Sequence, residues 1–204
     1  MKFRMFILLA ALAAGLGGCA VGVTQKYDTA QVDLAARSSM LTIAVLDHRP
    51  YVVSKDKPET FTGLSRGGYG NPFDVNTASG QPMAGDMAKA LEKGFADKGT
   101  KVSIVTLPPE TSEVDAQRKV ATPGGKGLLI VLTEWKSDTY FTTSLHYDVA
   151  AFVIDPAGQA VARGSINGVD PLGQGLEVRN NGPVTAFGPR MQRLLSQPRL
   201  AGAL

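Results

Sequence analysis

The run LTIAVL over 41–46 is the feature that most constrains the fold of this chain. It is apolar except for one threonine, and it is rich in β-branched residues. A strand with one face in water alternates apolar and polar residues, whereas a continuous apolar run of this length is typical of a strand buried on both faces. The sequence therefore predicts a sheet that begins near residue 41 and has protein on both of its sides.

Residues 83–98 predict the clearest helix of the sequence. Leu91 and Phe95 share one stripe with other apolar residues, and charged residues occupy the opposite side. This spacing is typical of an amphipathic helix that packs on a core. Pro82 suits the first turn of the helix, and Gly99 suits its C-terminal end.

The other elements follow from the same patterns. Ser112 and Asp115 have the spacing of a capping box, and a turn is predicted at 155–158 between two alternating segments. We predict strands over 102–106, 128–136, 144–154 and 160–169, and further helices over 111–121 and 189–196. This order predicts the α+β class, with a two-layer sandwich of a mixed or antiparallel sheet of about five strands and two to three helices. The domain is expected to be single and to span 41–204.

Residues 51–82 are predicted to form an unusually long connection between the first strand and the first helix. Most such connections are short, and a long ordered loop is usually functional. This one carries aromatic residues among its glycines, which is not typical of disorder. We predict that Arg66, Tyr69 and Phe73 bind a partner, since arginine and aromatic side chains make good contact anchors. The alternative, that these aromatics pin the loop to its own domain, stays open.

The first 20 residues predict export and a lipid anchor. Lys2 and Arg4 precede an apolar stretch of 11 residues over 6–16, which is shorter than the roughly 20 residues that cross a bilayer. The segment Leu16-Gly17-Gly18-Cys19 resembles the lipobox of bacterial lipoproteins. The resemblance implies a signal peptide over 1–18, cleavage before Cys19, and acyl chains on that cysteine. Residues 19–40 would then be a lipidated tether.

The residue after the cysteine indicates which of the two bacterial membranes would hold the anchor. In the lipoprotein family an aspartate there favours the inner membrane, and this chain has Ala20. The resemblance therefore implies the periplasmic face of the outer membrane of a Gram-negative cell. Without Lys2 and Arg4 the formal charge falls from +3 to +1, which gives no support to nucleic-acid binding. Cys19 is the only cysteine, so no disulfide and no cysteine-based metal site is predicted.

Catalysis has one candidate motif in the sequence. Residues 63–67 spell G-x-S-x-G, the nucleophile elbow of α/β-hydrolases, which works where a strand turns sharply into a helix. Here Phe61-Thr62 is a poor strand end, and the glycines and proline over 68–72 cannot start a helix. We therefore predict no catalytic residue and no enzyme activity. A lipid-anchored hydrolase that uses Ser65 is the alternative.

The two histidines are weak candidates for a metal site. His48 is next to Asp47, and His146 is two residues before Asp148, so each pair combines ligands that suit zinc. The pairs are far apart in the sequence, and hydrogen bonding is the predicted role of both histidines. We predict no metal and no cofactor.

The order of the elements gives a resemblance at the level of topology. A buried first strand, an amphipathic helix and a late antiparallel hairpin over 41–170 resemble the periplasmic domains of three lipoprotein families. These are the penicillin-binding-protein activator, curli-secretion and transporter-auxiliary families. The resemblance implies an adaptor or assembly factor that binds a periplasmic or envelope protein. It transfers no functional residue, because no family motif is present.

Overall fold

The buried run near residue 41 forms strand β2 (Met40–Asp47) in the computed structural model, which describes residues 22–204. The prediction for this strand is confirmed, since every residue of β2 after Met40 is buried. Helix α3 (Met83–Ala96) packs on one face of β2, and helix α4 (Glu113–Val120) packs on the other. The continuous apolar run is therefore explained by protein on both sides.

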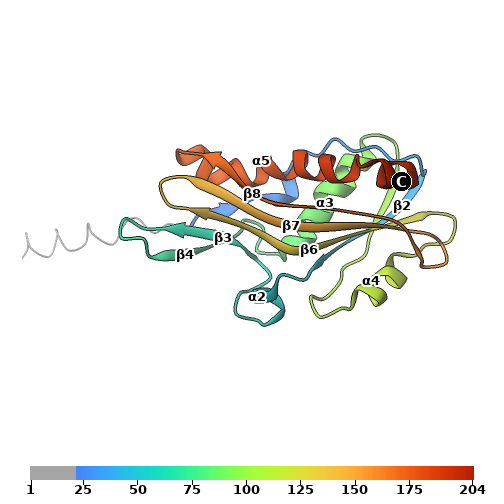
Figure 1. Cartoon of the computed structure of the whole chain (residues 1–204), viewed down its shortest axis with the longest axis horizontal. Coiled ribbons are helices and arrows are strands. Elements are labelled where there is room, and N and C mark those ends of the chain that lie inside the picture. The colour runs from blue at the N-terminus through green and yellow to red at the C-terminus, as the bar shows by residue number, and fades with distance from the viewer. Residues whose placement is uncertain (1–21) are drawn as a thin grey trace, which may run out of the picture.

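The sheet is mixed and is organised around β6 (Lys126–Thr139), its longest central strand. The other strands are β1 (Thr24–Gln25), β3 (Phe61–Arg66), β4 (Pro72–Thr77), β5 (Lys101–Ile104), β7 (Thr143–Ile154) and β8 (Ala160–Gly173). Along one edge, β6 pairs in parallel first with β2 and then with β3. Along its other edge it pairs with β7 in the antiparallel direction, and β8 follows β7. Figure 1 shows β6, β7 and β8 running side by side through most of the molecule.

Helices cover the two faces of the sheet unequally. Helices α3, α5 (Leu176–Leu195) and α6 (Pro198–Ala203) pack on one face and enclose the larger core. Helix α4 lies on the opposite side and covers only the half of the sheet around β2 and the start of β6 (Figure 1). The α+β class with a mixed sheet is confirmed. The predicted numbers of strands and helices are too low, because residues 22–204 hold eight strands and five α-helices.

The predicted loop over 51–82 is wrong as a description of this segment. It contains the short helix α2 (Pro50–Val53) and the antiparallel hairpin of β3 and β4. The hairpin joins the main sheet because β3 pairs with the end of β6, where Gly63 lies opposite Ser137. A side chain at Gly63 would collide with the backbone of Ser137, so glycine permits this pairing. The glycines that suggested a loop therefore include one that a strand requires.

The predicted tether over 19–40 is also wrong for most of its described part. Tyr27 and Leu34 are buried in the larger core, and β1 pairs with β4. The hydroxyl of Tyr27 accepts a hydrogen bond from the indole N–H of Trp135 at 2.8 Å, and both rings pack against Phe187. This segment is part of the domain because it completes the aromatic core. The predicted signal peptide, Cys19 and Ala20 lie outside the described residues.

The last helix is longer than its sequence pattern indicates. The prediction covers 189–196, whereas α5 begins at Leu176 and contains Pro183 and Pro189. Proline inside a helix removes one backbone hydrogen bond and usually breaks the helix. Here tertiary packing outweighs this cost, since Phe187 and Met191 are buried against the sheet.

A buried ion pair fixes the point where β2 ends. The guanidinium of Arg49 donates to both carboxylate oxygens of Asp47, at 2.7 and 2.6 Å, and Arg49 has no exposed surface. Its remaining nitrogen donates to the backbone carbonyls of Phe61 and Trp135, at 2.7 and 3.1 Å. Burial alone would lower the pKa of Arg49, but the bonds to Asp47 outweigh it and raise the pKa. One charged side chain thus ties together β2, β3 and β6.

Candidate functional site

The structure separates the three predicted contact residues. Arg66 ends β3, and its guanidinium forms two hydrogen bonds with the carboxylate of Asp138, at 2.8 and 2.7 Å. Tyr69 is at the tip of the β3–β4 hairpin and is 99% exposed, and Phe73 on β4 is 49% exposed. Arg66 is therefore held by its own domain, whereas the two aromatic residues are free at a surface. These residues belong to two different surfaces.

Arg66 belongs to the part of the sheet that α4 leaves uncovered, which we call the open face. Its residues point outward from the ends of β3 and β6, the start of β7 and the end of β8, and each is at least partly exposed. They are Arg66, Glu134, Lys136, Asp138, Ser144, His146, Asp148, Asn167 and Val169. The strand pairing aligns these residues in rows across the sheet, and one row consists of Lys136, His146 and Val169. The open face is therefore a surface of side chains that project from neighbouring strands of the sheet.

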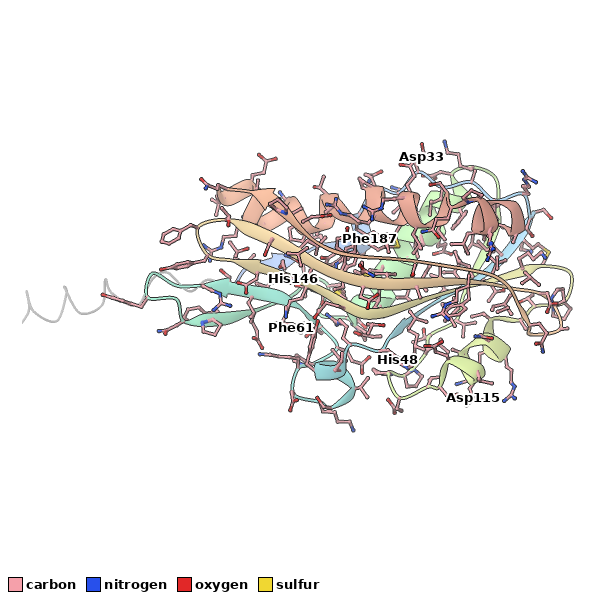
Figure 2. The ribbon with its side chains drawn as sticks, viewed as in Figure 1. Asp33, His48, Phe61, Asp115, His146 and Phe187 are labelled. Atoms are coloured by element: carbon pink, nitrogen blue, oxygen red, sulfur yellow. The ribbon has the colours of Figure 1, made fainter. Side chains whose placement is uncertain are left out.

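The polar side chains of the open face are held by one another. Besides the pair of Arg66 and Asp138, the ammonium of Lys136 lies 3.8 Å from the carboxylate of Glu134. The hydroxyl of Tyr51 donates to the same Glu134 at 2.6 Å. Figure 2 shows His146 on this region of the sheet. The face therefore presents ordered charges of both signs, which suits specific contact with another macromolecule.

The pKa of Asp138 gives a test of whether the ion pair on the open face is formed. Hydrogen bonds from Arg66 lower the pKa of Asp138, although partial burial opposes the shift. A lowered pKa means that the pair stabilises the fold above the ordinary pKa of aspartate. That contribution is lost as the pH falls through the lowered value. Arg66→Gln should raise the pKa of Asp138 toward its ordinary value, as measured by NMR titration of the carboxyl carbon. Arg118→Gln is the control, and an ordinary pKa for Asp138 in the parent chain would contradict the prediction.

The second surface joins two hairpin tips, and we call it the tip surface. It consists of Tyr69 and Phe73 from the β3–β4 hairpin and of Tyr140 and Phe141 from the β6–β7 hairpin. Phe141 is 77% exposed and Tyr140 is 42% exposed. The hydroxyl of Tyr140 donates to the carbonyl of Gly68 at 3.3 Å, which connects the two tips. Sequence reasoning missed Tyr140 and Phe141, although adjacent aromatics in a turn between two predicted strands are a readable signal.

Ser65 of the G-x-S-x-G motif lies within strand β3, and its side chain is buried. Its hydroxyl accepts a hydrogen bond from the guanidinium of Arg179 on α5. Ser65 pairs with Thr139 and shares its face of the sheet, whereas His146 points to the opposite, open face. The motif leads into a hairpin and not into a helix. The structure therefore does not bring Ser65, His146 and Asp148 together.

The histidines also remain separate from each other. His48 lies after β2, and its Nε2 is 2.8 Å from the backbone carbonyl of Thr111. His146 is hydrogen-bonded to the hydroxyl of Ser144 at 3.3 Å. Figure 2 shows His48 near α4 and His146 on the main sheet. Within residues 22–204 no three metal-ligating side chains are grouped so that they could hold an ion. No helix in the same range has both the length and the apolar character to cross a membrane.

Comparison with known proteins gives similarity of fold. No protein-family model and no curated protein matches the sequence. Among solved structures, the chain resembles protein XCC0632 of Xanthomonas campestris, which is assigned to family DUF330. The identity is 13% and the TM-score is 0.50, over 90% of this chain and 94% of that one. This likeness supports the α+β architecture.

Two other solved structures have lower TM-scores. PelC of Paraburkholderia phytofirmans, solved as a dodecamer, is 15% identical with a TM-score of 0.41, over 85% of this chain and 94% of PelC. Lipoprotein GNA1162 of Neisseria meningitidis is 14% identical with a TM-score of 0.30, over 76% of this chain and 97% of GNA1162. Scores this low carry no argument about the function of this chain.

Proposed function

We propose that this chain is a lipid-anchored, non-enzymatic adaptor or assembly factor of the cell envelope, and that its open face binds a protein partner. The proposal places the protein on the periplasmic face of the outer membrane, with acyl chains on Cys19. The lipobox-like segment Leu16–Cys19 supports the lipid anchor. Ala20, which stands where an aspartate would favour the inner membrane, supports the outer membrane.

The open face is the observation that carries the binding role. Helices cover one face of the sheet and half of the other, yet they leave β6, β7 and β8 bare where the charged rows lie. Val169 lies in one of these rows and is 60% exposed, beside the polar His146. An apolar side chain within a rim of ordered charges is a common composition of protein–protein interfaces. Side chains that project from an exposed sheet suit a protein surface better than a small molecule, which needs a concave pocket.

A crosslinking experiment in intact envelopes tests this proposal. A photo-crosslinking amino acid replaces Val169, and a matched variant carries it at Val161. Both valines are on β8 and have similar exposure, 60% and 50%, but Val161 is outside the open face. We expect one specific protein to be captured from position 169 and not from 161, and to be lost in a Cys19→Ser background. Equal capture from both positions, or no capture from 169, would contradict the open face as the contact surface.

The serine of the G-x-S-x-G motif provides a second test of the non-enzymatic role. Ser65→Ala removes the hydroxyl that accepts from Arg179, and this should cost about 1 kcal/mol of stability. We expect the variant to stay folded and to keep the crosslink from position 169. Growth of a strain that depends on the chain is the readout of function, with Ser103→Ala at an exposed serine as the control. Loss of function in a folded, partner-binding Ser65→Ala protein would favour the hydrolase alternative.

A further inference from the structure

We propose that the tip surface rests on the lipid bilayer that holds Cys19. This inference depends on the lipid anchor of the proposed function, but it concerns a different surface from the open face. The tip surface would be a second, non-covalent attachment, which fixes how the domain is oriented on the membrane.

The chain segments that form the tip surface and its surroundings contain no charged residue. Three segments meet there, namely 67–73, 139–145 and 171–176, and none contains Lys, Arg, Asp or Glu. The pairing of Ser65 with Thr139 and of Thr143 with Gly173 brings the three segments together. The third segment ends at Leu176, which is 71% exposed. Exposed aromatic and aliphatic side chains with no charge among them suit the interface between lipid headgroups and acyl chains.

The path of the chain brings the anchor to the same end. Strand β1 pairs in parallel with β4, and Thr24 lies opposite Asn76. Strand β4 begins at Pro72, beside the hairpin tip, so following β1 backward from Thr24 leads toward the tip surface. Cys19 is only three residues before Gly22, where the described chain begins, and three residues span at most about 11 Å. A lipid on Cys19 would therefore hold this end of the domain close to the bilayer.

The tips are held in place rather than hanging free. Arg66 at the base of one hairpin is bound to Asp138 at the base of the other. The hydroxyl of Tyr140 reaches Gly68, and its ring lies 4.0 Å from that of Phe141, measured between centroids. These contacts fix the positions of the two tips and of the Tyr140 ring, so less conformational entropy is lost when the tip surface enters the interface, while the exposed Tyr69 side chain stays free to insert.

A protein partner fits the tip surface less well than lipid does. Protein contacts gain specificity from charges around an apolar centre. Of the charges around it, Arg66 is paired with Asp138 and Lys57 with Asp74 within the domain, and Glu177 is exposed after Leu176. A bilayer interface requires no specific charge from the protein. With the tips on the membrane, β6 and β7 extend away from it, and the open face remains accessible from the periplasm.

Fluorescence quenching by lipids tests the inference on the full-length, lipidated protein. Because Cys19 is acylated, a new cysteine is the only thiol that a nitrobenzoxadiazole fluorophore can label. We compare Tyr69→Cys and Phe141→Cys with Val161→Cys, at the distant β7–β8 end, in vesicles of phosphatidylethanolamine and phosphatidylglycerol that contain spin-labelled lipid. We expect blue-shifted emission and strong quenching at 69 and 141, and water-like emission with little quenching at 161.

The outcomes of this experiment separate the inference from the lipid anchor on which it rests. Protein that floats with the vesicles but shows no more quenching at 69 and 141 than at 161 overturns the inference, while the anchor stands. Protein that does not float at all contradicts the lipid anchor, and therefore the proposed function as well. A protein crosslinked from position 69 in envelopes, together with water-like emission there in vesicles, would assign the tip surface to a protein partner and overturn the inference.

Discussion

Arg49→Met is expected to lower the free energy of unfolding by about 3–5 kcal/mol, because it leaves a buried carboxylate without its partner. The guanidinium has no exposed surface and makes two hydrogen bonds with Asp47. It also satisfies the carbonyls of Phe61 and Trp135. The substitution therefore strands three acceptor groups in the core at once. Methionine fills a similar volume, so the loss is expected to come from polarity and not from a cavity.

Urea denaturation of a protein that consists of residues 22–204 measures this loss of stability. Arg118→Met is the matched control, because Arg118 pairs with Asp115 at 3.1 Å but its side chain is 70% exposed. An exposed pair of this kind contributes about 0–1 kcal/mol. The double variant Asp47→Leu with Arg49→Met should be more stable than Arg49→Met alone, since no buried charge is then left unpaired. Equal effects of Arg49→Met and Arg118→Met would show that the buried pair does not hold the strands together.

Periodic segments made most of the fold predictable. The run over 41–46, the stripe of α3 and the late alternating strands all form the predicted elements within a few residues. The capping pattern is confirmed as well, because the hydroxyl of Ser112 accepts from the N–H of Asp115. In each of these elements the local pattern and the tertiary environment favour the same structure. Such agreement is what allows a sequence to be interpreted without its structure.

The features that the sequence did not predict have a common physical cause. Strand β3 contains a glycine because its backbone lies against Ser137, and α5 contains two prolines that its packing tolerates. Arginine is usually a surface residue, yet Arg49 is fully buried in the core. None of these features can be inferred locally, since each depends on a partner that is distant in the sequence.

The candidate site was predictable only in part. The alternative, that the aromatics pin this segment to its own domain, holds for Phe61, which is buried against Tyr51, but not for the exposed Tyr69 and Phe73. That Tyr140 and Phe141 share this surface could not be predicted, because it depends on the two hairpins lying side by side in the fold. The open face could not be predicted from alternation alone, because alternation does not show which half of a face a helix covers. That distinction came from the position of α4.

Gly94→Ala is expected to destabilise the protein by about 1–3 kcal/mol, although glycine-to-alanine changes within helices usually stabilise. The segment around Gln31 and Val32 passes between α3 and α5. A methyl group at Gly94 would collide with the carbonyl oxygen of Val32, and one at Gly188 would collide with that of Gln31. Two glycines on facing helices thus form the channel that holds the N-terminal segment against the core.

Gly85→Ala is the matched control, because Gly85 is in the same helix and nothing lies within 4 Å of its added methyl group. There the ordinary helix preference should apply, with a gain of up to about 1 kcal/mol. Urea denaturation measures both variants, and hydrogen exchange at Tyr27 and Leu34 should show that Gly94→Ala loosens the N-terminal segment first. If Gly94→Ala stabilised the protein as Gly85→Ala does, the segment would not be clamped. Because this segment joins Cys19 to the core, its release would separate the anchor from the domain and let the tip surface leave the membrane.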